Sequence, residues 1–483
     1  MLSSTVAAAD ILETGPQPQN HSYAGSKSAA YSLSQSRSQP RPQSRPQSRP
    51  SRQRPTSNDR RNRVSREDIP TQKELTSRSF QRELRANQRA AAKLIRRIET
   101  ENPKKRKQTT SRKKLKEQYG LAFVEMPGGE ILARHGEILG VNLSGESRRV
   151  VLELGFTVMR QTVLEKIGIT LDLLRIPAGM SMKEALEAVR AADQKSHYDY
   201  NMAYAPAAYH KGFIVGNVPQ GEIGTRASSR DEQVKGKNTV ADENRLLVGM
   251  IDTGVNAEHK SLGNVEFLQG NVGRGPTVTP RDHGTAVASI LARGRPARII
   301  AIDVFSGPAA YADAESIVIA LEFLARQNVG VINMSVAGPN SPLLAQAVKN
   351  LIKQGYIIVA AVGNEGPAGP ERFPAAQSGV VGVTAVDGSF AVFEMANQGE
   401  AVDYAALGVQ IEAASVRGQK KYSGTSFAAP IVSAFLANRY QHPDTSGASK
   451  ALLVLDRAVT DLGPEGPDGI FGRGFLANQE GSR

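Results

Sequence analysis

The sequence predicts a doubly wound, mostly parallel α/β domain that follows a small α+β domain and a disordered basic tail. Three observations support this prediction. Near-continuous apolar strands alternate with helical segments after residue 246, shorter strands and helices alternate between residues 130 and 206, and residues 1–118 are rich in Ser, Gln, Arg and Pro. Apolar strands separated by helices are typical of a parallel sheet covered on both faces. The 483 residues thus divide into a tail (1–118), a small domain (119–206), a linker (207–241) and a main domain (242–483).

The tail holds most of the positive charge. Of the 60 Lys and Arg and 47 Asp and Glu in the chain, residues 1–118 contain 27 and 10, so the remainder is slightly acidic. Ser26 to Arg63 has too few apolar groups to offset the entropy of ordering, which predicts disorder. Apolar side chains at helical spacing predict a basic amphipathic helix over Glu74 to Glu101. The tail either binds an anionic surface or is a solvated linker. It has no base-reading motif, so specific nucleic-acid recognition is not predicted.

Other residue counts exclude several classes of protein. The chain has no cysteine, which excludes disulfides, thiolate metal sites and a cysteine nucleophile. It has no run of about 20 apolar residues, so a transmembrane protein is not predicted. Met1 to Asp10 resembles the end of a signal peptide, which favours a secreted or periplasmic protein whose true start lies upstream. A cytoplasmic protein with a flexible terminus is the alternative.

The small domain shows strands and helices in the order β-α-β-β-α-β, which is the ferredoxin-like arrangement. Ser181 and Glu184 form a capping box, because Ser can accept from the third amide of a helix while Glu reaches back to the cap. The expected elements are strand Glu137–Asn142, helix Ser144–Leu154 ended by Gly155, strands Phe156–Val163 and Ile169–Ile176, helix Ser181–Ala192 and strand Tyr198–Tyr204.

The main domain contains the residues that can carry chemistry. Its expected strands are Leu247–Ile251, Arg298–Val304, Val329–Met334, Ile357–Ala361 and Val380–Val386. Active residues of such sheets lie at the carboxyl ends of strands. Asp252 follows the first strand, His283 lies at the start of a predicted helix, and Ser426 lies at the start of an apolar helix. A hydroxyl becomes a good nucleophile when an imidazole takes its proton and a carboxylate orients the imidazole. These three residues supply those groups.

The segments around these residues resemble the signatures of the subtilisin-like serine proteases, or subtilases. They read Asp252-Thr-Gly, His283-Gly-Thr-Ala-Val-Ala and Gly424-Thr-Ser-Phe-Ala-Ala-Pro430. Their chain order, Asp, His, Ser, is that of subtilisin. The resemblance runs from about Leu246 to Phe475. It implies a subtilisin-like fold and a serine endopeptidase that acts on polypeptides through an acyl-enzyme.

The resemblance also implies further site residues. Asn364 would bind the oxyanion together with the backbone N–H of Ser426. Arg372 stands near the base of the specificity pocket, where subtilases usually have a small residue. An acidic substrate residue before the cut is therefore one expectation. Phe427 and Ile431 replace residues common in the family. The substrate backbone would pair, as an added strand, with the edge formed by Ser335, Val336, Ala337 and Gly338.

Three interpretations stay open at this point. The small domain has the position of a subtilase propeptide and is expected to inhibit the site, while a permanently attached accessory domain is the alternative. The chemistry requires no cofactor. Calcium stabilises many subtilases, but no acidic loop of EF-hand type occurs, so structural calcium stays unassigned. His135, His210 and His259 lack a motif and are expected at the surface.

A different class of function competes with catalysis. A non-catalytic binding protein could use a subtilase body and a basic tail to attach to an anionic surface. The intact catalytic residues argue against this alternative.

Overall fold

The computed structural model describes residues 116–117, 119–126, 129–207, 245–293, 295–307 and 311–477. All of them belong to one of the two units into which the chain divides, Arg61–Arg483. The predicted disordered stretch and amphipathic helix of the tail lie outside the described residues, as do nearly all of the predicted linker, His210 included.

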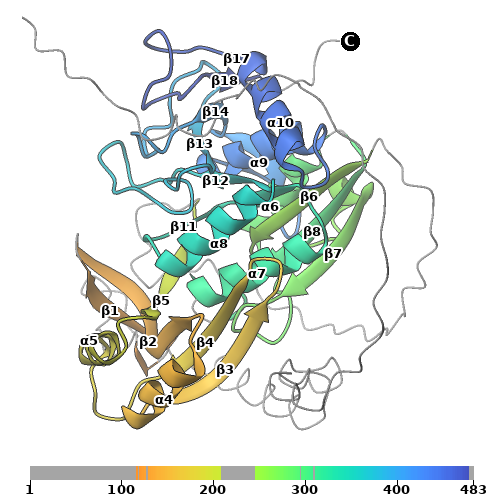
Figure 1. The fold of residues 1–483 in the computed structure, drawn as a ribbon. Coiled ribbons are helices and arrows are strands. Elements are labelled where there is room, and N and C mark those ends of the chain that lie inside the picture. Colours follow the sequence, from red (N-terminus) through yellow and green to blue (C-terminus); the bar gives the residue numbers. More distant parts are fainter. Residues whose placement is uncertain are drawn as a thin grey trace, which may run out of the picture. The chain divides into compact units, whose positions relative to one another are not determined.

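The small domain is an antiparallel sheet with two helices. The strands run in the order β5-β2-β4-β3, and β1 pairs with β2 (Figure 1). Val151 of α4 and Leu186 of α5 are buried in the same apolar cluster as the sheet. The elements are β1 (Leu121–Met126), β2 (Gly129–Val141), α4 (Gly145–Glu153), β3 (Thr157–Leu164), β4 (Ile169–Arg175), α5 (Met182–Ala192) and β5 (His197–Pro206).

Local sequence signals account for the helices of the small domain. The capping box is confirmed, since the Ser181 hydroxyl accepts from the Glu184 amide and the Glu184 carboxylate accepts from the Ser181 amide. Ser144 caps α4 in a similar way. After that helix, Gly155 adopts a φ of +83°, which favours glycine.

The main domain is built on a nine-stranded sheet in the order β17-β18-β14-β13-β12-β10-β6-β8-β7. Each neighbouring pair is parallel except β17 with β18. The prediction of a largely parallel sheet is therefore confirmed. The strands are β6 (Leu246–Asp252), β7 (Val265–Asn271), β8 (Ala297–Asp303), β10 (Val331–Met334), β12 (Ile357–Ala361), β13 (Val381–Val386), β14 (Tyr404–Leu407), β17 (Val459–Thr460) and β18 (Phe475–Leu476).

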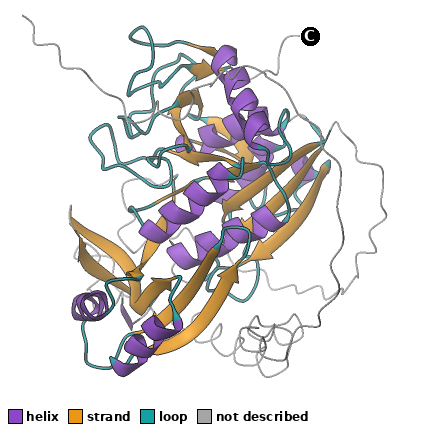
Figure 2. Ribbon diagram, in the orientation of Figure 1, coloured by secondary structure: helices purple, strands orange, loops and turns teal. Residues whose placement is uncertain are grey.

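Helices cover both faces of this sheet (Figure 2). Strand β8 shows how: Ile300 and Ile302 join the apolar cluster that contains α7 (Ala314–Arg326) and α8 (Pro342–Lys353). The alternate residues, Ile299 and Ala301, join the cluster that contains α6 (Asp282–Leu291) and α9 (Thr425–Ala437). Successive residues of a strand point to opposite faces, so the doubly wound arrangement follows. On the second face, α10 (Thr445–Ala458) packs against α9.

The small domain docks on the α7 and α8 face of the main domain. Its core residues belong to the same apolar cluster as those two helices. The turn that joins β3 to β4 reaches α7, where the Glu322 carboxylate accepts the amides of Lys166 and Ile167. On α8, the side chain of Asn350 donates to the carbonyl of Ile167. Two short strands, β9 (Ala312–Asp313) and β11 (Val336–Ala337), pair antiparallel with the end of β5.

Candidate active site

Asp252 and His283 meet where β6 ends and α6 begins. The Nδ1 atom of His283 lies 2.7 Å from Oδ1 of Asp252, which is fully buried. The same carboxylate oxygen accepts the Thr253 amide at 2.6 Å, and the Thr253 hydroxyl accepts the Gly284 amide at 2.8 Å. A hydrogen bond from Nδ1 leaves the other ring nitrogen free to accept a proton.

Ser426 lies in the first turn of α9, and its residue is fully buried. Gly424 begins the helix with a φ of +146°, a conformation that L side chains rarely adopt. The Ser426 hydroxyl is 3.4 Å from the backbone carbonyl oxygen of Ser335. Ser335 is itself fixed on α9, because its hydroxyl donates to the Ser426 carbonyl at 2.9 Å.

Three buried polar atoms at this site have no hydrogen-bond partner. They are Nε2 of His283, Oδ2 of Asp252 and Nδ2 of Asn364. The Asn364 side chain is oriented by its other atom, since Oδ1 accepts the Thr425 amide at 3.0 Å. Buried donors and acceptors without a partner are costly, so a ligand that pairs with them removes that cost. His283 and Asn364 therefore present a proton acceptor and a donor that a bound peptide could use.

Phe427 supports the imidazole from α9. Its ring centroid lies 5.5 Å from that of His283 and 4.9 Å from that of Tyr422. Tilted rings at these separations attract each other beyond simple burial. Phe427 is thus a packing residue that helps to fix the orientation of His283.

The predicted substrate edge carries a segment of the chain itself. In β11, Val336 is opposite Pro206 of β5 and Ala337 is opposite Ala205. Past the strand, Gly338 forms an antiparallel bridge with Phe373. The Ser335 to Gly338 segment therefore lies between the end of the small domain and the loop that contains Arg372.

Comparisons with known proteins agree with this geometry. The profile of the subtilase family (peptidase S8) matches residues 243–474. The chain is 33% identical over 229 residues to the major intracellular serine protease of Bacillus subtilis (strain 168), covering 42% of this chain and 69% of that protein. It is 31% identical over 253 residues to subtilisin DY of Bacillus licheniformis, covering 48% of this chain and 88% of the relative.

The chain belongs to the subtilase family. It is a serine-type endopeptidase. The fold also resembles that of fervidolysin from Fervidobacterium pennivorans, a keratinolytic enzyme related to subtilisin, with a TM-score of 0.55 at 18% identity. That similarity covers 73% of this chain and 61% of fervidolysin.

Arg372 has a partner within this subtilase that sequence reasoning missed. Its Nε donates to Oε1 of Glu365 at 3.0 Å, and the other Glu365 oxygen accepts the Asn364 amide. The guanidinium is therefore already neutralised, which removes the reason to expect an acidic substrate residue before the cut. Glu365 stands seven residues before Arg372 in the chain.

A second buried carboxylate, Asp303, lies beside Asp252, and the sequence analysis did not single it out. Parallel pairing of β6 with β8 puts it opposite Asp252. Burial raises the pKa of Asp303 to about 6, although the Thr279 and Phe305 amides that donate to it act in the opposite direction. Its signal in the sequence was the position at the carboxyl end of the predicted strand Arg298–Val304.

His259 corrects an expectation. It is buried rather than at the surface, with Nδ1 at 2.7 Å from the Ser261 hydroxyl and Nε2 at 3.0 Å from the Gly418 carbonyl. It holds two loops together through Ser261 and Gly418. His135 is half-buried on β2.

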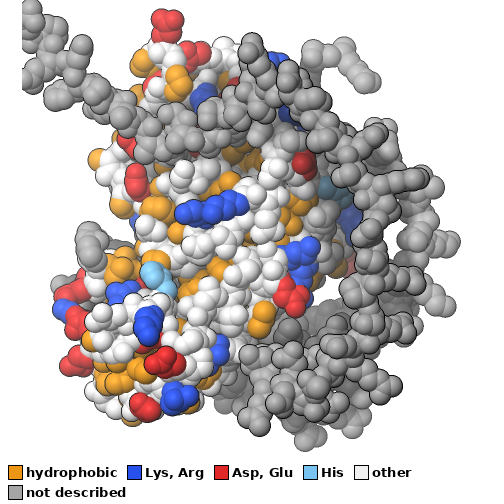
Figure 3. Space-filling view, in the orientation of Figure 1, with side chains coloured by type: hydrophobic (Ala, Val, Ile, Leu, Met, Phe, Trp, Pro, Cys, Tyr) orange, Lys and Arg blue, Asp and Glu red, His pale blue; other side chains and the backbone are white. Residues whose placement is uncertain are grey.

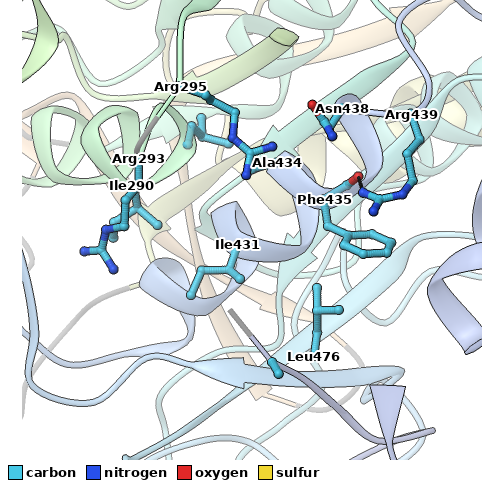
Figure 4. Close-up of a pocket in the computed structure, with 11 residues that line it drawn as sticks. Ile290, Arg293, Arg295, Ile431, Ala434, Phe435, Asn438, Arg439 and Leu476 are labelled. Atoms are coloured by element: carbon cyan, nitrogen blue, oxygen red, sulfur yellow. Dashed lines mark hydrogen bonds between the residues drawn. The ribbon is translucent and has the colours of Figure 1, made fainter. Parts of the chain in front are cut away.

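Elsewhere, a small pocket opens between the C-terminal ends of α6 and α9, and Arg293, Arg295 and Arg439 line it (Figure 4). None of its lining residues belongs to the candidate triad. Within the described ranges, no group of three His, Asp or Glu side chains is arranged to hold a metal ion. No helix of the described part of the chain is long and apolar enough to span a membrane.

Proposed function

We propose that this endopeptidase cleaves peptide bonds with Ser426 as nucleophile, His283 as general base and acid, and Asp252 as the group that orients His283. The observation that carries the proposal is the 2.7 Å contact between His283 and Asp252 beside a buried, unpartnered Nε2. The imidazole takes the Ser426 proton as the oxygen bonds to the carbonyl carbon, and then gives it to the leaving amine. Water hydrolyses the acyl-enzyme by the same route.

Asn364 and the backbone N–H of Ser426 are proposed to bind the oxyanion. This is supported by Nδ2 of Asn364, which is buried without a partner while its Oδ1 is held by Thr425. A donor that is preoriented in a water-excluded site stabilises developing charge without reorganising. Polypeptide substrates would add a strand along Ser335, Val336, Ala337 and Gly338.

Two substitutions test these roles. Ser426→Ala is expected to remove nearly all peptidase activity on casein, and Asn364→Ala to lower kcat by roughly 100- to 1,000-fold, the loss known for the corresponding donor of subtilisin. A phosphonylating serine probe, followed by intact mass measurement, should label the parent and not Ser426→Ala. Ser449→Ala, on α10, is the matched control and should keep parental activity. A Ser426→Ala protein that cleaves casein at the parental rate would refute the mechanism.

The small domain, residues 119–206, is proposed to be a ferredoxin-like propeptide that inhibits the site. Support comes from the end of β5, which occupies the substrate edge, and from the apolar cluster that the domain shares with α7 and α8. The interface also buries charge. One oxygen of Asp313 caps α7 through Ser316, and the other accepts from Arg134 of the small domain and Arg274 of the main domain.

The tail is proposed to attach the enzyme to an anionic surface, and secretion is proposed with it. On the face in Figure 3, acidic and basic side chains are interspersed over the described surface, and no broad patch of one charge is present there. Deleting residues 1–118 should leave kcat/KM on small neutral peptides unchanged, while retention on an anionic matrix falls and loses its salt dependence. Loss of folding or activity on deletion would mean that the tail is structural.

A further inference from the structure

Asp303 is a buried carboxylate that ties the end of β8 to the segment in front of α6. Its Oδ2 accepts the Thr279 amide at 2.8 Å, and its Oδ1 accepts the Phe305 amide at 2.9 Å. The residue is 2% exposed. An ionised carboxylate makes stronger hydrogen bonds with backbone amides than a neutral acceptor does. Asp303 therefore joins two parts of the chain that are 24 residues apart.

The segment 279–281 leads directly into α6. A parallel bridge links it to Gly254, and the Arg281 amide also donates to the Gly254 carbonyl at 2.9 Å. A Cβ at Gly254 would lie only 2.5 Å from the backbone of this segment, so the two stretches of backbone are in direct contact. Gly254 stands two residues after Asp252, and His283 stands two residues after the segment. The position of the segment therefore affects how Asp252 and His283 meet.

The start of α6 is held by groups that lie outside the helix. Its N-cap residue, Arg281, makes no side-chain cap hydrogen bond. An N-cap side chain normally accepts an amide of the first turn and fixes it. Here the Thr253 hydroxyl accepts the Gly284 amide from the β6 side, and Asp303 holds the preceding segment from the β8 side. The first turn, which contains His283, thus depends on both anchors.

We propose that Asp303 is a positioning residue for catalysis, which holds the segment in front of α6 so that His283 keeps its contact with Asp252. The inference rests on the proposed function, because Asp303 would act through the same imidazole. Asp252 and Asp303 are register partners on adjacent strands, but they bind different groups. Asp252 binds the imidazole, whereas both oxygens of Asp303 bind backbone amides.

The protein keeps this carboxylate at a cost in stability. Burial, and then the neighbouring charge of Asp252, raises the pKa of Asp303 to about 6. The two bound amides and the charge of Arg281 act in the opposite direction. The Arg281 guanidinium is itself held elsewhere, since it donates to the Gly307 carbonyl at 3.2 Å. At neutral pH the folded protein therefore holds a buried charge that opposes folding. Carboxylates of this kind are concentrated at functional sites.

Two substitutions at this position test the inference in the full chain. Asp303→Ala removes both acceptors, whereas Asp303→Asn keeps one, because its Nδ2 can only donate. We expect kcat on a small neutral peptide to fall by about 100-fold in Asp303→Ala, the loss known for a misplacement of about 1 Å. In Asp303→Asn it should fall by about tenfold, as expected for one lost hydrogen bond. KM should stay nearly unchanged, because no substrate contact is removed.

Asp456→Asn is the matched control for these rates. Asp456 lies on α10, where its carboxylate accepts from the Tyr404 hydroxyl and from Arg473. This variant also removes a partnered carboxylate, but it should keep the parental kcat. Asp303→Asn keeps the test valid if Asp303→Ala fails to fold.

Proton NMR of full-length Ser426→Ala chains separates positioning from a general loss of structure. The Nδ1–H of His283 that donates to Asp252 should give a low-field signal, assigned by its loss in His283→Gln. We expect the signal to disappear in Asp303→Ala and to persist in Asp456→Asn. A parental kcat in Asp303→Ala, or a lower kcat with an unchanged signal, would overturn this inference and leave the proposed function standing. A parent enzyme without Ser426-dependent activity would instead overturn the proposed function.

Discussion

Gly284 shows how closely the residues around His283 and Asp252 approach each other. A Cβ at this position would lie 2.2 Å from the Thr253 carbonyl oxygen, which belongs to the loop after β6. Real Cβ atoms do not come so near to backbone, so any other residue would push α6 away from β6. His283 and Asp252, the immediate neighbours of Gly284 and Thr253, would then lose their 2.7 Å contact.

Asp303 provides a prediction for pH dependence. Burial raises its pKa to about 6 from an ordinary 3.8, so the folded protein holds this proton more tightly than the unfolded chain. The resulting stabilisation is complete below about pH 4 and is lost as the pH rises through about 6. Asp303→Asn, which is always neutral, should therefore gain stability relative to the parent between pH 4 and 7, by at most about 3 kcal/mol.

Urea unfolding of both proteins, in a Ser426→Ala background that is expected from the proposed mechanism to be free of autolysis, measures this difference. Asp387→Asn is the matched control. Hydrogen bonds, first from the Ser389 hydroxyl, lower the pKa of Asp387, so its contribution to the free energy of unfolding changes only below about pH 4. A difference between parent and Asp303→Asn that stays constant from pH 4 to 7 would contradict the prediction.

Residues with a fixed local motif were predictable, and residues defined by a distant partner were not. Local sequence patterns place Asp252, His283 and Asn364 near the end of a strand or the start of a helix. The pairing of Arg372 with Glu365 depends on how two parts of one loop fold back on each other, and no periodic pattern of apolar residues in the sequence indicates that fold. The burial of His259 similarly depends on Gly418, more than 150 residues away.

At the scale of elements, the turn between β3 and β4 anchors the small domain. Ile167 is 1% exposed, and Glu322 accepts both its amide and that of Lys166. Ile167→Ala would remove buried apolar contact at a cost of about 2–5 kcal/mol. We expect the amides of Lys166 and Ile167 to exchange hydrogen on the order of 100-fold faster in this variant, because local opening becomes easier.

Hydrogen exchange with mass spectrometry on full-length Ser426→Ala chains checks this expectation. Val163→Ala on the same hairpin is the control, since Val163 is 41% exposed and its loss should change exchange little. Equal protection of the turn in both variants would show that the anchor does not depend on Ile167.

At the scale of elements, the sequence could not predict strands in which the alternation of apolar and polar residues is interrupted. Strand β2 begins at Gly129, eight residues before the predicted start, because its first residues pair with β1. Its pairing with β5 shifts register between Ala133 and Ile138. A bulge of this kind breaks the period of two. Strand β7 reads Val-Glu-Phe-Leu-Gln-Gly-Asn and is half-buried along most of its length. As the edge of a parallel sheet it lacks the continuous apolar run of the inner strands.

At the scale of the whole molecule, the small domain and the α7 and α8 face share one cluster of buried apolar side chains. Separation of the domains would expose that cluster and break the ion pair between Arg134 and Asp313. Burial raises the pKa of Asp313, but Arg134 and Arg274 overcome this and hold it below its usual range. The carboxylate is thus charged in the docked state, and removal of Arg134 alone would still leave it paired with Arg274.

This shared interface leads to a prediction about the separated parts. While the domains are linked, the effective concentration is roughly millimolar, and a cut in residues 207–241 converts inhibition into an ordinary bimolecular equilibrium. Residues 119–207 expressed alone should inhibit the 242–483 domain at micromolar concentration and speed its refolding. The fragment includes β1, since Leu121 and Val124 are buried in the small domain.

Tyr204→Ala should weaken inhibition by the fragment, because it removes the ring packed on Gly338. The control Val163→Ala should not weaken it, because Val163 is exposed. The rates of peptide cleavage and of refolding, measured as the fragment is titrated into the 242–483 domain, test this prediction. If the fragment changes neither rate, the small domain is an accessory module and not an inhibitor.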